Sequence, residues 1–496
     1  MLSTGAIWLS SAVAAHAQSQ RPATGGLRPV QAPLPVVAGP PISPFTVTLR
    51  PDQVEQLRRV LDTAHTHGFD IGAYGPDTAV ALMGARDPAS RQAVQEQLIV
   101  LTLAYAQAVR AGRLAVTDFD PEWGLRPAAY DPGPEFVQAI AEDRLGPWLD
   151  ALPPPYTGYQ TLRRGLTTYR AIAERGGWTA LGVGPEMKLG NVGTRVEALR
   201  TRLAVEDVSV SLQGPAVLDE TLLTAVKRAQ KRFGLLPDGV LGARTLAALD
   251  TPVDLRIDQI LANMERWRWL PQTLPADRIQ VNIAAAVLSL FQADAPTLTM
   301  RAVTGRPGDE TPMLESRVHS IVLNPPWNVP SSIAAKELWP KERANPGYFA
   351  RNDFVIIPTG DGGSRLQQKA GPKAALGLIK FDFANPYGVY LHDTPSRAKF
   401  ASFSRLASHG CVRLEKPSAL AHAIFAGDPV WTPQVIDETI AAGKTVRASL
   451  KQPIAVFLLY WTAYVTPDGQ VNFRDDPYGW DRRLVQRIAA GASSPA

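Results

Sequence analysis

The spacing of hydrophobic residues divides the chain into a helical region and a later sheet-rich region. Over 46–185, apolar residues recur every three or four positions between Pro and Gly clusters, which predicts a helical scaffold domain. Over 255–490, short apolar or alternating runs separated by Gly and Pro predict a mainly-β domain. Residues 18–45 are rich in Pro, nearly free of charge and aperiodic, which indicates an extended linker. The pattern as a whole is typical of a multidomain α+β protein.

A small three-helix unit is predicted between these regions, over 188–252. Asp219 can cap a helix whose apolar residues share one face, Gly234 can end that helix, and Thr245 begins another. The pattern AVxxxQxxFGLxxDGxxGxxTxxxL within this unit closely resembles the peptidoglycan-binding-like domain attached to many cell-wall enzymes. The alternative is a structural helix-turn-helix module that binds no ligand.

A capping insertion at about 328–376 is predicted inside the sheet-rich domain. The run SSIAAKELWPKERANPGYFARND has a helical pattern, and the loop that follows it is rich in Gly. An insertion beside a functional site commonly acts as a lid. We therefore expect this segment to cover part of the site.

The charge balance gives no sign of a nucleic-acid-binding surface. The 496 residues include 51 Lys and Arg and 46 Asp and Glu, a net charge of +5, without a basic run. The most apolar internal segment, 98–109, contains Gln107 and is followed by Arg110, which favours a core helix over a membrane span. We expect no nucleic-acid partner, no membrane span and a monomer.

The N-terminal residues predict export. A short apolar stretch at 6–15 is followed by Ala15-His16-Ala17, a small-x-small site, so we expect a signal peptide over 1–17. The stretch departs from the usual signal because no Lys or Arg precedes it. Export without an anchor predicts a location in the periplasm.

Cys411 is the only cysteine of the chain, so it forms no internal disulfide. An exported protein then carries a free thiol in an oxidising compartment, which favours a reactive role, although many lone cysteines are buried structural residues. His392 ends a predicted strand, and His409 and Gly410 precede the cysteine in a predicted turn. A catalytic thiol needs such an imidazole, a group that orients it, and donors for an oxyanion. Zinc binding is the alternative, but His-x-Cys is a tight spacing for zinc.

These residues resemble the signature of the L,D-transpeptidase (YkuD-type) catalytic domain. His392 is followed by fifteen intervening residues and then by Ser408-His409-Gly410-Cys411-Val412. The run GPKAALGLIKFDFANPYGVYLHDTP, the Arg413 that follows the core motif and the C-terminal hairpin are similar to the long YcbB-like subgroup. Arg413 stands where the general signature has Asn.

The resemblance implies roles for the residues of the motif. Cys411 would form a thioester with a donor stem peptide, and His392 would be the general base. The backbone carbonyl of Asp393 would orient His392, and the N–H groups of His409, Gly410 and Cys411 would form the oxyanion hole. No metal or other cofactor is implied.

Four further residues are candidates for substrate binding. Tyr390 matches a tyrosine beside the pocket of the family. Arg413 would hold either a substrate carboxylate or a structural ion pair, since a fixed guanidinium suits both. Ser408 would line the pocket or brace the turn, and Trp327 would line the pocket or lie in the core.

The function that follows is a periplasmic cysteine L,D-transpeptidase that cross-links peptidoglycan stem peptides during cell-wall biogenesis. Donor and acceptor stem peptides are the expected partners, and the resemblance implies that carbapenem β-lactams acylate Cys411. A hydrolase with the same thioester and a non-catalytic peptidoglycan-binding scaffold are the alternatives.

Overall fold

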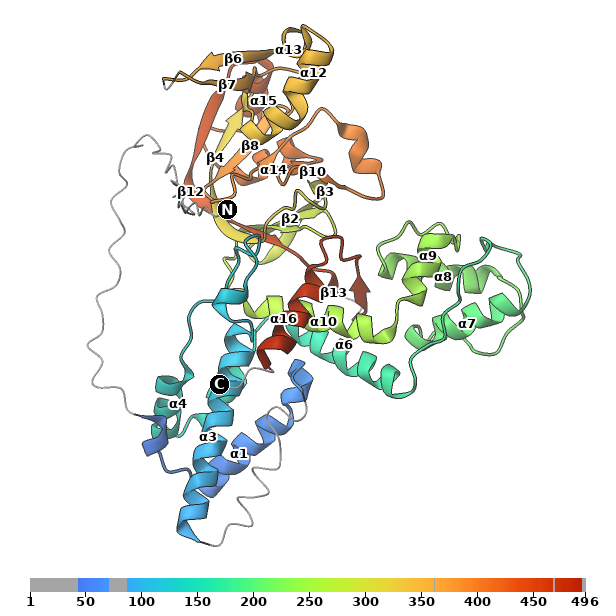
Figure 1. Cartoon of the computed structure of the whole chain (residues 1–496), viewed down its shortest axis with the longest axis vertical. Coiled ribbons are helices and arrows are strands. Elements are labelled where there is room, and N and C mark those ends of the chain that lie inside the picture. The colour runs from blue at the N-terminus through green and yellow to red at the C-terminus, as the bar shows by residue number, and fades with distance from the viewer. Residues whose placement is uncertain (1–42, 71–86, 361, 467–468, 493–496) are drawn as a thin grey trace, which may run out of the picture. The chain divides into compact units, whose positions relative to one another are not determined.

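The structure, a computed structural model, describes residues 43–70, 87–360, 362–466 and 469–492 (Figure 1). The expected signal peptide and the expected linker up to residue 42 lie outside the described residues. Helical regions precede a β-rich domain built on a large mixed sheet, which confirms the predicted fold class.

The first helices enclose a core of their own. Pro stands at the first turn of α1, α3 and α4, where its missing N–H costs nothing, and Asp87 caps α3 by accepting from the N–H of Ser90. Leu57, Ile99 and Phe136 are buried in the shared core. The elements of this part are η1 (Pro44–Thr46), α1 (Pro51–Asp62), η2 (Ala64–His67), α3 (Pro88–Ala111), η3 (Val116–Asp118), α4 (Pro132–Ala141) and α5 (Leu145–Ala151).

Helix α3 is the longest of these helices, and its second half is strongly apolar. Within the described ranges, Pro88–Asp118 is the segment that passes a test for a membrane span by length and composition, which the sequence analysis did not expect. Leu98, Ile99, Tyr105 and Val109 on α3 are nevertheless buried in the core that includes residues of α1, α4 and α5. This packing favours the interpretation of 98–109 as part of a core helix.

A second core joins α6 to the three-helix unit. Tyr159 and Leu166 of α6 are buried with Leu199 and Val226 of that unit and with Phe473 of a short hairpin. Asp219 caps α8 as predicted, because its Oδ1 accepts from the N–H of Leu222 at 2.8 Å. The elements are α6 (Thr157–Glu174), α7 (Thr194–Glu206), α8 (Glu220–Arg232), α9 (Ala243–Asp250), α10 (Val253–Arg268), β13 (Ala463–Val465) and β14 (Val471–Phe473).

Helix α6 contributes to a different hydrophobic core from the helices before it. We predicted that 46–185 forms one helical domain, and that division stays a prediction; within it, the apolar face of α6 packs into the second core. Helical periodicity shows that a helix has an apolar face and does not show which partner covers that face.

The β-rich domain is built on a nine-stranded sheet in the order β10-β3-β11-β9-β8-β4-β12-β1-β2, which closes because β2 also pairs with β3. Val281, Ile321, Phe381 and Val456 are fully buried in its core. The strands are β1 (Arg278–Asn282), β2 (Val287–Gln292), β3 (Ala295–Gly305), β4 (Leu314–Leu323), β8 (Ile379–Phe383), β9 (Leu391–His392), β10 (Leu406–Ser408), β11 (Val412–Leu414) and β12 (Val446–Leu459). Four helical segments accompany them: η5 (Arg397–Ala401), α14 (Pro417–Ile424), α15 (Pro433–Ala441) and α16 (Trp480–Ala492).

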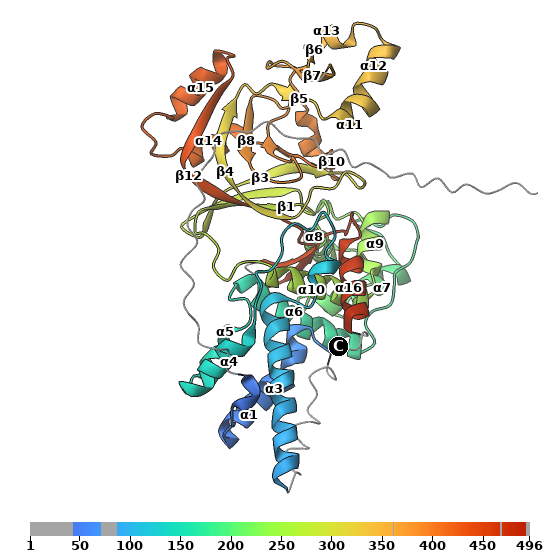
Figure 2. The same cartoon turned by 60° about the vertical axis from the view of Figure 1, so that its left-hand side comes forward.

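The segment predicted as a capping insertion forms a lobe with its own small sheet, in the order β5-β7-β6, and its own core (Figure 2). Leu338, Phe349 and Leu366 lie in that core. Its elements are β5 (Trp327–Asn328), α11 (Ser331–Ile333), the π-helical turn η4 (Ala334–Leu338), α12 (Trp339–Ala344), α13 (Tyr348–Arg351), β6 (Phe354–Pro358) and β7 (Ser364–Gln368).

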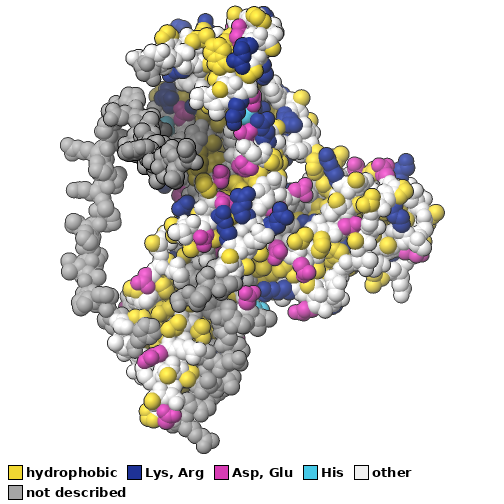
Figure 3. Space-filling view, in the orientation of Figure 1, with side chains coloured by type: hydrophobic (Ala, Val, Ile, Leu, Met, Phe, Trp, Pro, Cys, Tyr) yellow, Lys and Arg dark blue, Asp and Glu magenta, His cyan; other side chains and the backbone are white. Residues whose placement is uncertain are grey.

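Charged side chains on the surface are mixed in sign. On the face drawn in Figure 3, Lys and Arg side chains are interspersed with Asp and Glu. Several arginines are paired with acidic residues, as Arg58 is with Glu55 and Asp62. This mixture agrees with the small net charge of the sequence.

A buried ionic cluster connects α10 to the first helical region. Both side-chain oxygens of Glu265 are used: one accepts from the N–H of Arg113 at 2.6 Å and the other pairs with Arg268 at 2.6 Å. Arg268 also donates to the carbonyl of His67 at 2.5 Å. Glu265 and Arg268 are almost fully buried, so neither charge is stabilised by water.

We predict that Glu265→Ala lowers the free energy of unfolding by about 3–5 kcal/mol, because it leaves a buried guanidinium without its anion. Urea unfolding followed by circular dichroism measures the change. Glu142→Ala is the matched control, since its ion pair with Arg144 is exposed and should matter little. An equal shift of both midpoints would contradict the prediction.

Candidate active site

Two short parallel strands bring the distant parts of the motif together. Strand β9 pairs with β11, so that His392 lies opposite Arg413 and Leu391 lies opposite Val412. The N–H of Val412 donates to the carbonyl of Tyr390 at 3.1 Å. Residues that are fifteen or more positions apart in sequence therefore become neighbours across one strand pair.

His392 is buried and held in one orientation by the backbone. Its Nδ1 donates to the carbonyl of Asp393 at 2.5 Å, as the resemblance implies. This bond leaves Nε2 as the ring nitrogen that can accept a proton. Burial, together with the charge of Arg413, lowers the pKa of His392 to about 3, although the backbone of Asp393 and Leu376 acts in the opposite direction. The imidazole is therefore neutral at ordinary pH.

The Cys411 thiol is close to Tyr390 and to two positive charges. Burial raises the pKa of Cys411 above the ordinary cysteine value, while hydrogen bonds from the backbone and hydroxyl of Tyr390 and the charges of Lys380 and Arg413 favour the thiolate. The net shift is upward, so at rest the cleft is lined by a protonated thiol and a neutral imidazole. The base must then take the thiol proton as the sulfur attacks.

The turn before the cysteine is braced by its own polar groups. Ser408 donates to the carbonyl of Cys411 at 2.6 Å and accepts from the N–H of Gly410 at 3.2 Å. Thr311 donates to the carbonyl of Gly410 at 2.7 Å. Gly410 has φ of +102°, a conformation that favours glycine. The hydroxyl of Ser408 is thus placed for bracing the turn rather than for reaching a substrate.

The same hydrogen bonds show which of the three expected oxyanion donors are already engaged within the turn. The N–H of Gly410 is engaged by Ser408, whereas those of His409 and Cys411 have no hydrogen-bond partner in the described parts of the chain. The N–H groups of His409 and Cys411 are therefore available to a ligand, and Gly410 permits the turn through its positive φ.

Arg413 lines the cleft without a partner for its charge. Within the described residues, its guanidinium forms no ion pair and no hydrogen bond, and burial lowers its pKa. A half-buried cation without a partner costs free energy unless a ligand supplies an anion. Of the two alternatives for Arg413, the structural ion pair has no partner among the described residues, and the substrate carboxylate stays a prediction. The carboxylate of Asp393 is used elsewhere, by the N–H of Leu378 and by Arg397.

Tyr390 and Trp327 lie along the same wall. The hydroxyl of Tyr390 is close to both Trp327 and Cys411. The Lys380 ammonium lies 4.2 Å from the centre of the Tyr390 ring. Trp327 lines the cleft and also packs against the core of the insertion, which are the two alternatives predicted for it.

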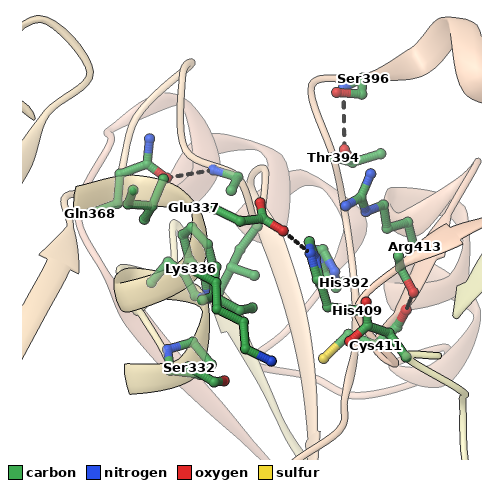
Figure 4. A pocket seen from close by; sticks show the side chains of 18 of the residues that line it. Ser332, Lys336, Glu337, Gln368, His392, Thr394, Ser396, His409, Cys411 and Arg413 are labelled. Carbon is green, nitrogen blue, oxygen red and sulfur yellow. Dashed lines mark hydrogen bonds and ion pairs between the residues drawn. The ribbon is translucent and has the colours of Figure 1, made fainter. Parts of the chain in front are cut away.

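His409 contacts the insertion through its side chain. Its Nε2 lies 2.6 Å from Oε1 of Glu337, a residue that the sequence analysis did not identify (Figure 4). Together the insertion and the sheet enclose a cleft of about 830 Å³. Trp327, Tyr390, His392, Ser408, His409, Cys411 and Arg413 all line it. In the described residues no group of three His, Cys, Asp or Glu side chains is arranged to hold a metal.

Comparisons with known families agree with this geometry. Residues 276–431 match the model of the L,D-transpeptidase catalytic domain. The chain contains an L,D-transpeptidase catalytic domain. Upstream of this transpeptidase domain, residues 48–166 match a "Scaffold domain" and residues 192–249 match a "Putative peptidoglycan binding domain".

A curated relative from Haemophilus influenzae is named "Putative L,D-transpeptidase" and is 33% identical over 253 residues. The match covers 48% of this chain and about half of that protein, 51%.

Solved structures give weaker likenesses to the transpeptidase domain. An L,D-transpeptidase from Xylanimonas cellulosilytica is 16% identical, with 56% of this chain and 99% of that chain covered and a TM-score of 0.18. The catalytic domain of an E. faecium L,D-transpeptidase, acylated by ertapenem, is 12% identical over 38% of this chain and 99% of that chain, with a TM-score of 0.19. Scores of this size assign no residue of the transpeptidase domain to a role.

Three residues around Cys411 and its turn were missed from the sequence. Thr311 and Glu337 reach the turn from distant segments, and Lys380 lies across β8–β9 from His392. None of them stands within a recognisable motif. The pairing of β8 with β9 would have placed Lys380 near His392 if the register had been known.

We predict that alkylation of Cys411 in the transpeptidase domain by iodoacetamide rises with pH and has its inflection above the ordinary cysteine pKa. A thiol with a raised pKa is protonated at neutral pH, and an imidazole with a pKa of about 3 adds no inflection near pH 6.5. Because the chain has one cysteine, intact mass reports this site alone.

Arg413→Gln should move that inflection to higher pH, because the Arg413 charge stabilises the thiolate. Arg365→Gln, an exposed change on β7, is the control with the same loss of charge. A plateau reached below pH 7 in the unmodified protein would contradict the neutral thiol and imidazole pair.

Proposed function

We propose that this protein is a periplasmic cysteine L,D-transpeptidase that cross-links peptidoglycan stem peptides through a thioester on Cys411. The observation that carries the proposal is one cleft lined by the oriented neutral imidazole of His392, by the only thiol of the chain and by the guanidinium of Arg413, which has no partner among the described residues. This set supplies a base, a nucleophile and an anion-binding group, which acyl transfer from a carboxylate-bearing peptide requires.

Acylation follows from the resting state of the site. His392 takes the thiol proton on Nε2 as Cys411 Sγ attacks the donor carbonyl, so the charge moves to the carbonyl oxygen. The N–H groups of His409 and Cys411 stabilise that oxyanion. The intermediate collapses when the C–N bond to the D-residue breaks, and the proton on His392 passes to the leaving amine. The Cys411 thioester and a free D-residue remain.

Transfer runs through the same residues in the opposite direction. An amine of a neighbouring stem peptide gives a proton to His392 and attacks the thioester carbonyl. The thiolate of Cys411 leaves and takes that proton from His392, which restores the neutral thiol and imidazole. The diaminopimelate side chain is the acceptor amine that we propose. Water in place of the amine would give the hydrolase.

Arg413 is proposed to bind a carboxylate of the stem peptide. Its guanidinium lines the cleft and has no partner among the described residues. An ionic bond between this half-buried guanidinium and a substrate carboxylate is a charge-assisted contact, which is stronger than a hydrogen bond between neutral groups. The "Putative peptidoglycan binding domain" match at 192–249 supports the same class of partner.

The periplasmic location is proposed from the sequence pattern of residues 1–17 and from the substrate, which lies outside the cytoplasmic membrane.

The test is to incubate the full chain with disaccharide-tetrapeptide and to identify muropeptides by mass spectrometry. We expect a cross-linked dimer that lacks one terminal D-Ala, formed by the unmodified protein and absent with Cys411→Ala. Tripeptide monomer without dimer would overturn transfer in favour of hydrolysis. No product from either protein would overturn the proposed donor.

We further predict that Arg413→Gln lowers kcat/KM for that donor roughly 10- to 100-fold, the size expected for loss of a charge-assisted contact. Donors in which one carboxylate at a time is amidated identify the carboxylate that Arg413 binds. Amidation of that carboxylate should lower kcat/KM of the unmodified protein and should not lower kcat/KM of Arg413→Gln further. An unchanged kcat/KM in Arg413→Gln would show that the guanidinium binds no substrate carboxylate.

A further inference from the structure

The side chain of His409 has a partner that the reaction does not require. Its Nε2 lies 2.6 Å from Oε1 of Glu337, which comes from the insertion, 72 positions earlier in the chain. Neither side chain is fully exposed: 27% of His409 and 34% of Glu337 remain accessible. Figure 4 shows Glu337 projecting from the insertion toward His409. The contact therefore links the insertion to the residue immediately before Gly410 and Cys411.

The same carboxylate reaches the other side of the turn. Glu337 Oε1 is 3.5 Å from Nη2 of Arg306, at the end of β3. The backbone N–H of Arg306 donates to the carbonyl of Ser408 at 3.0 Å, and the Arg306 side chain also pairs with Asp309 at 2.6 Å. One carboxylate thus contacts the turn directly through His409 and indirectly through Arg306.

Local sequence explains why Glu337 lies here. Residues 331–344 are helical throughout, but the stretch Ala334–Leu338 is a π-helical turn. Pro340 follows it and lacks the N–H that would bond to the carbonyl of Lys336 in a regular helix, and its ring crowds that carbonyl. Leu338 is buried in the core of the insertion beside this turn. Turns of this kind are frequent at functional sites because they redirect one side chain.

From these contacts we infer that Glu337 is a positioning residue: by holding the His409 imidazole, it fixes the backbone N–H of His409 for the oxyanion. The inference rests on the proposed function, because it assigns Glu337 to the acylation step. Glu337 does not act as a base here, since the oxygen nearest the turn is occupied by His409. It acts through His409, and the insertion thereby takes part in building the site rather than only covering it.

Two reactions of the single thiol separate this role from a general structural one. Alkylation of Cys411 by iodoacetamide forms no oxyanion, whereas acylation of Cys411 by ertapenem, which the proposed thioester chemistry implies, forms one. In that acylation the Sγ–C bond forms, the lactam C–N bond breaks and the nitrogen receives the proton from His392. A misplaced oxyanion donor should slow the second reaction and spare the first.

The experiment compares Glu337→Gln and Glu337→Ala with the unmodified full chain by intact mass. We expect the maximal rate of acylation by ertapenem to fall roughly 10- to 100-fold, as for a displaced catalytic group. The ertapenem concentration for half-maximal rate and the rate of iodoacetamide alkylation should stay unchanged. Glu337→Gln, which keeps an acceptor oxygen, should lose less than Glu337→Ala.

Two controls test whether the effect is specific to Glu337 and whether it acts through His409. Arg343→Gln changes charge by one unit on the exposed side of the same insertion and should behave as the unmodified protein. In a His409→Gln background, Glu337→Gln should have no further effect, because the contact through which it acts is already lost.

Several outcomes would overturn the inference. These are equal rates of acylation in the Glu337 variants and the unmodified protein, a parallel loss of acylation and alkylation, or a full Glu337 effect in the His409→Gln background. A different failure concerns the proposed function: if the unmodified protein is alkylated at Cys411 but forms no acyl adduct with ertapenem or with stem peptide, the thioester chemistry itself is wrong.

Discussion

The parallel pairing of β9 with β11 is the constraint on which the site depends. These strands have only two and three residues, yet their register puts His392 opposite Arg413 and next to the turn that carries Cys411. They are too short to be stable alone. Strand β8 holds β9 and β3 holds β11, so the large closed sheet supplies the stability that the site strands lack.

The charges around the thiol decide how the site can work. Burial keeps His392 neutral and Cys411 protonated, so no ion pair forms between them at rest. Arg413 remains charged and without a partner in the described residues. The resting site therefore contains a positive charge and no thiolate. A carboxylate bound to Arg413 would offset the free-energy cost of burying its guanidinium.

The sequence was sufficient for the residues that have a local pattern. The His392 to Cys411 spacing, the Asp219 cap and the alternation of the strands predicted elements that the structure contains. Contacts that depend on the tertiary arrangement were not predictable. The partner of α6, the Thr311 bond to Gly410 and the Glu337 bond to His409 each join segments far apart in the chain. The occupied N–H of Gly410 was missed for a related reason, since it depends on the rotamer of Ser408.

The central claim is that Cys411 carries the acyl group during turnover. The most direct measurement is acid-quenched intact mass of the full chain mixed with disaccharide-tetrapeptide, followed by peptide mapping and hydroxylamine treatment. The account predicts an adduct equal to the donor acyl group, located on the peptide that contains Cys411 and released by hydroxylamine as a thioester. Turnover of the donor with Cys411 unmodified at every quench time, or the same adduct on Cys411→Ala, would contradict it.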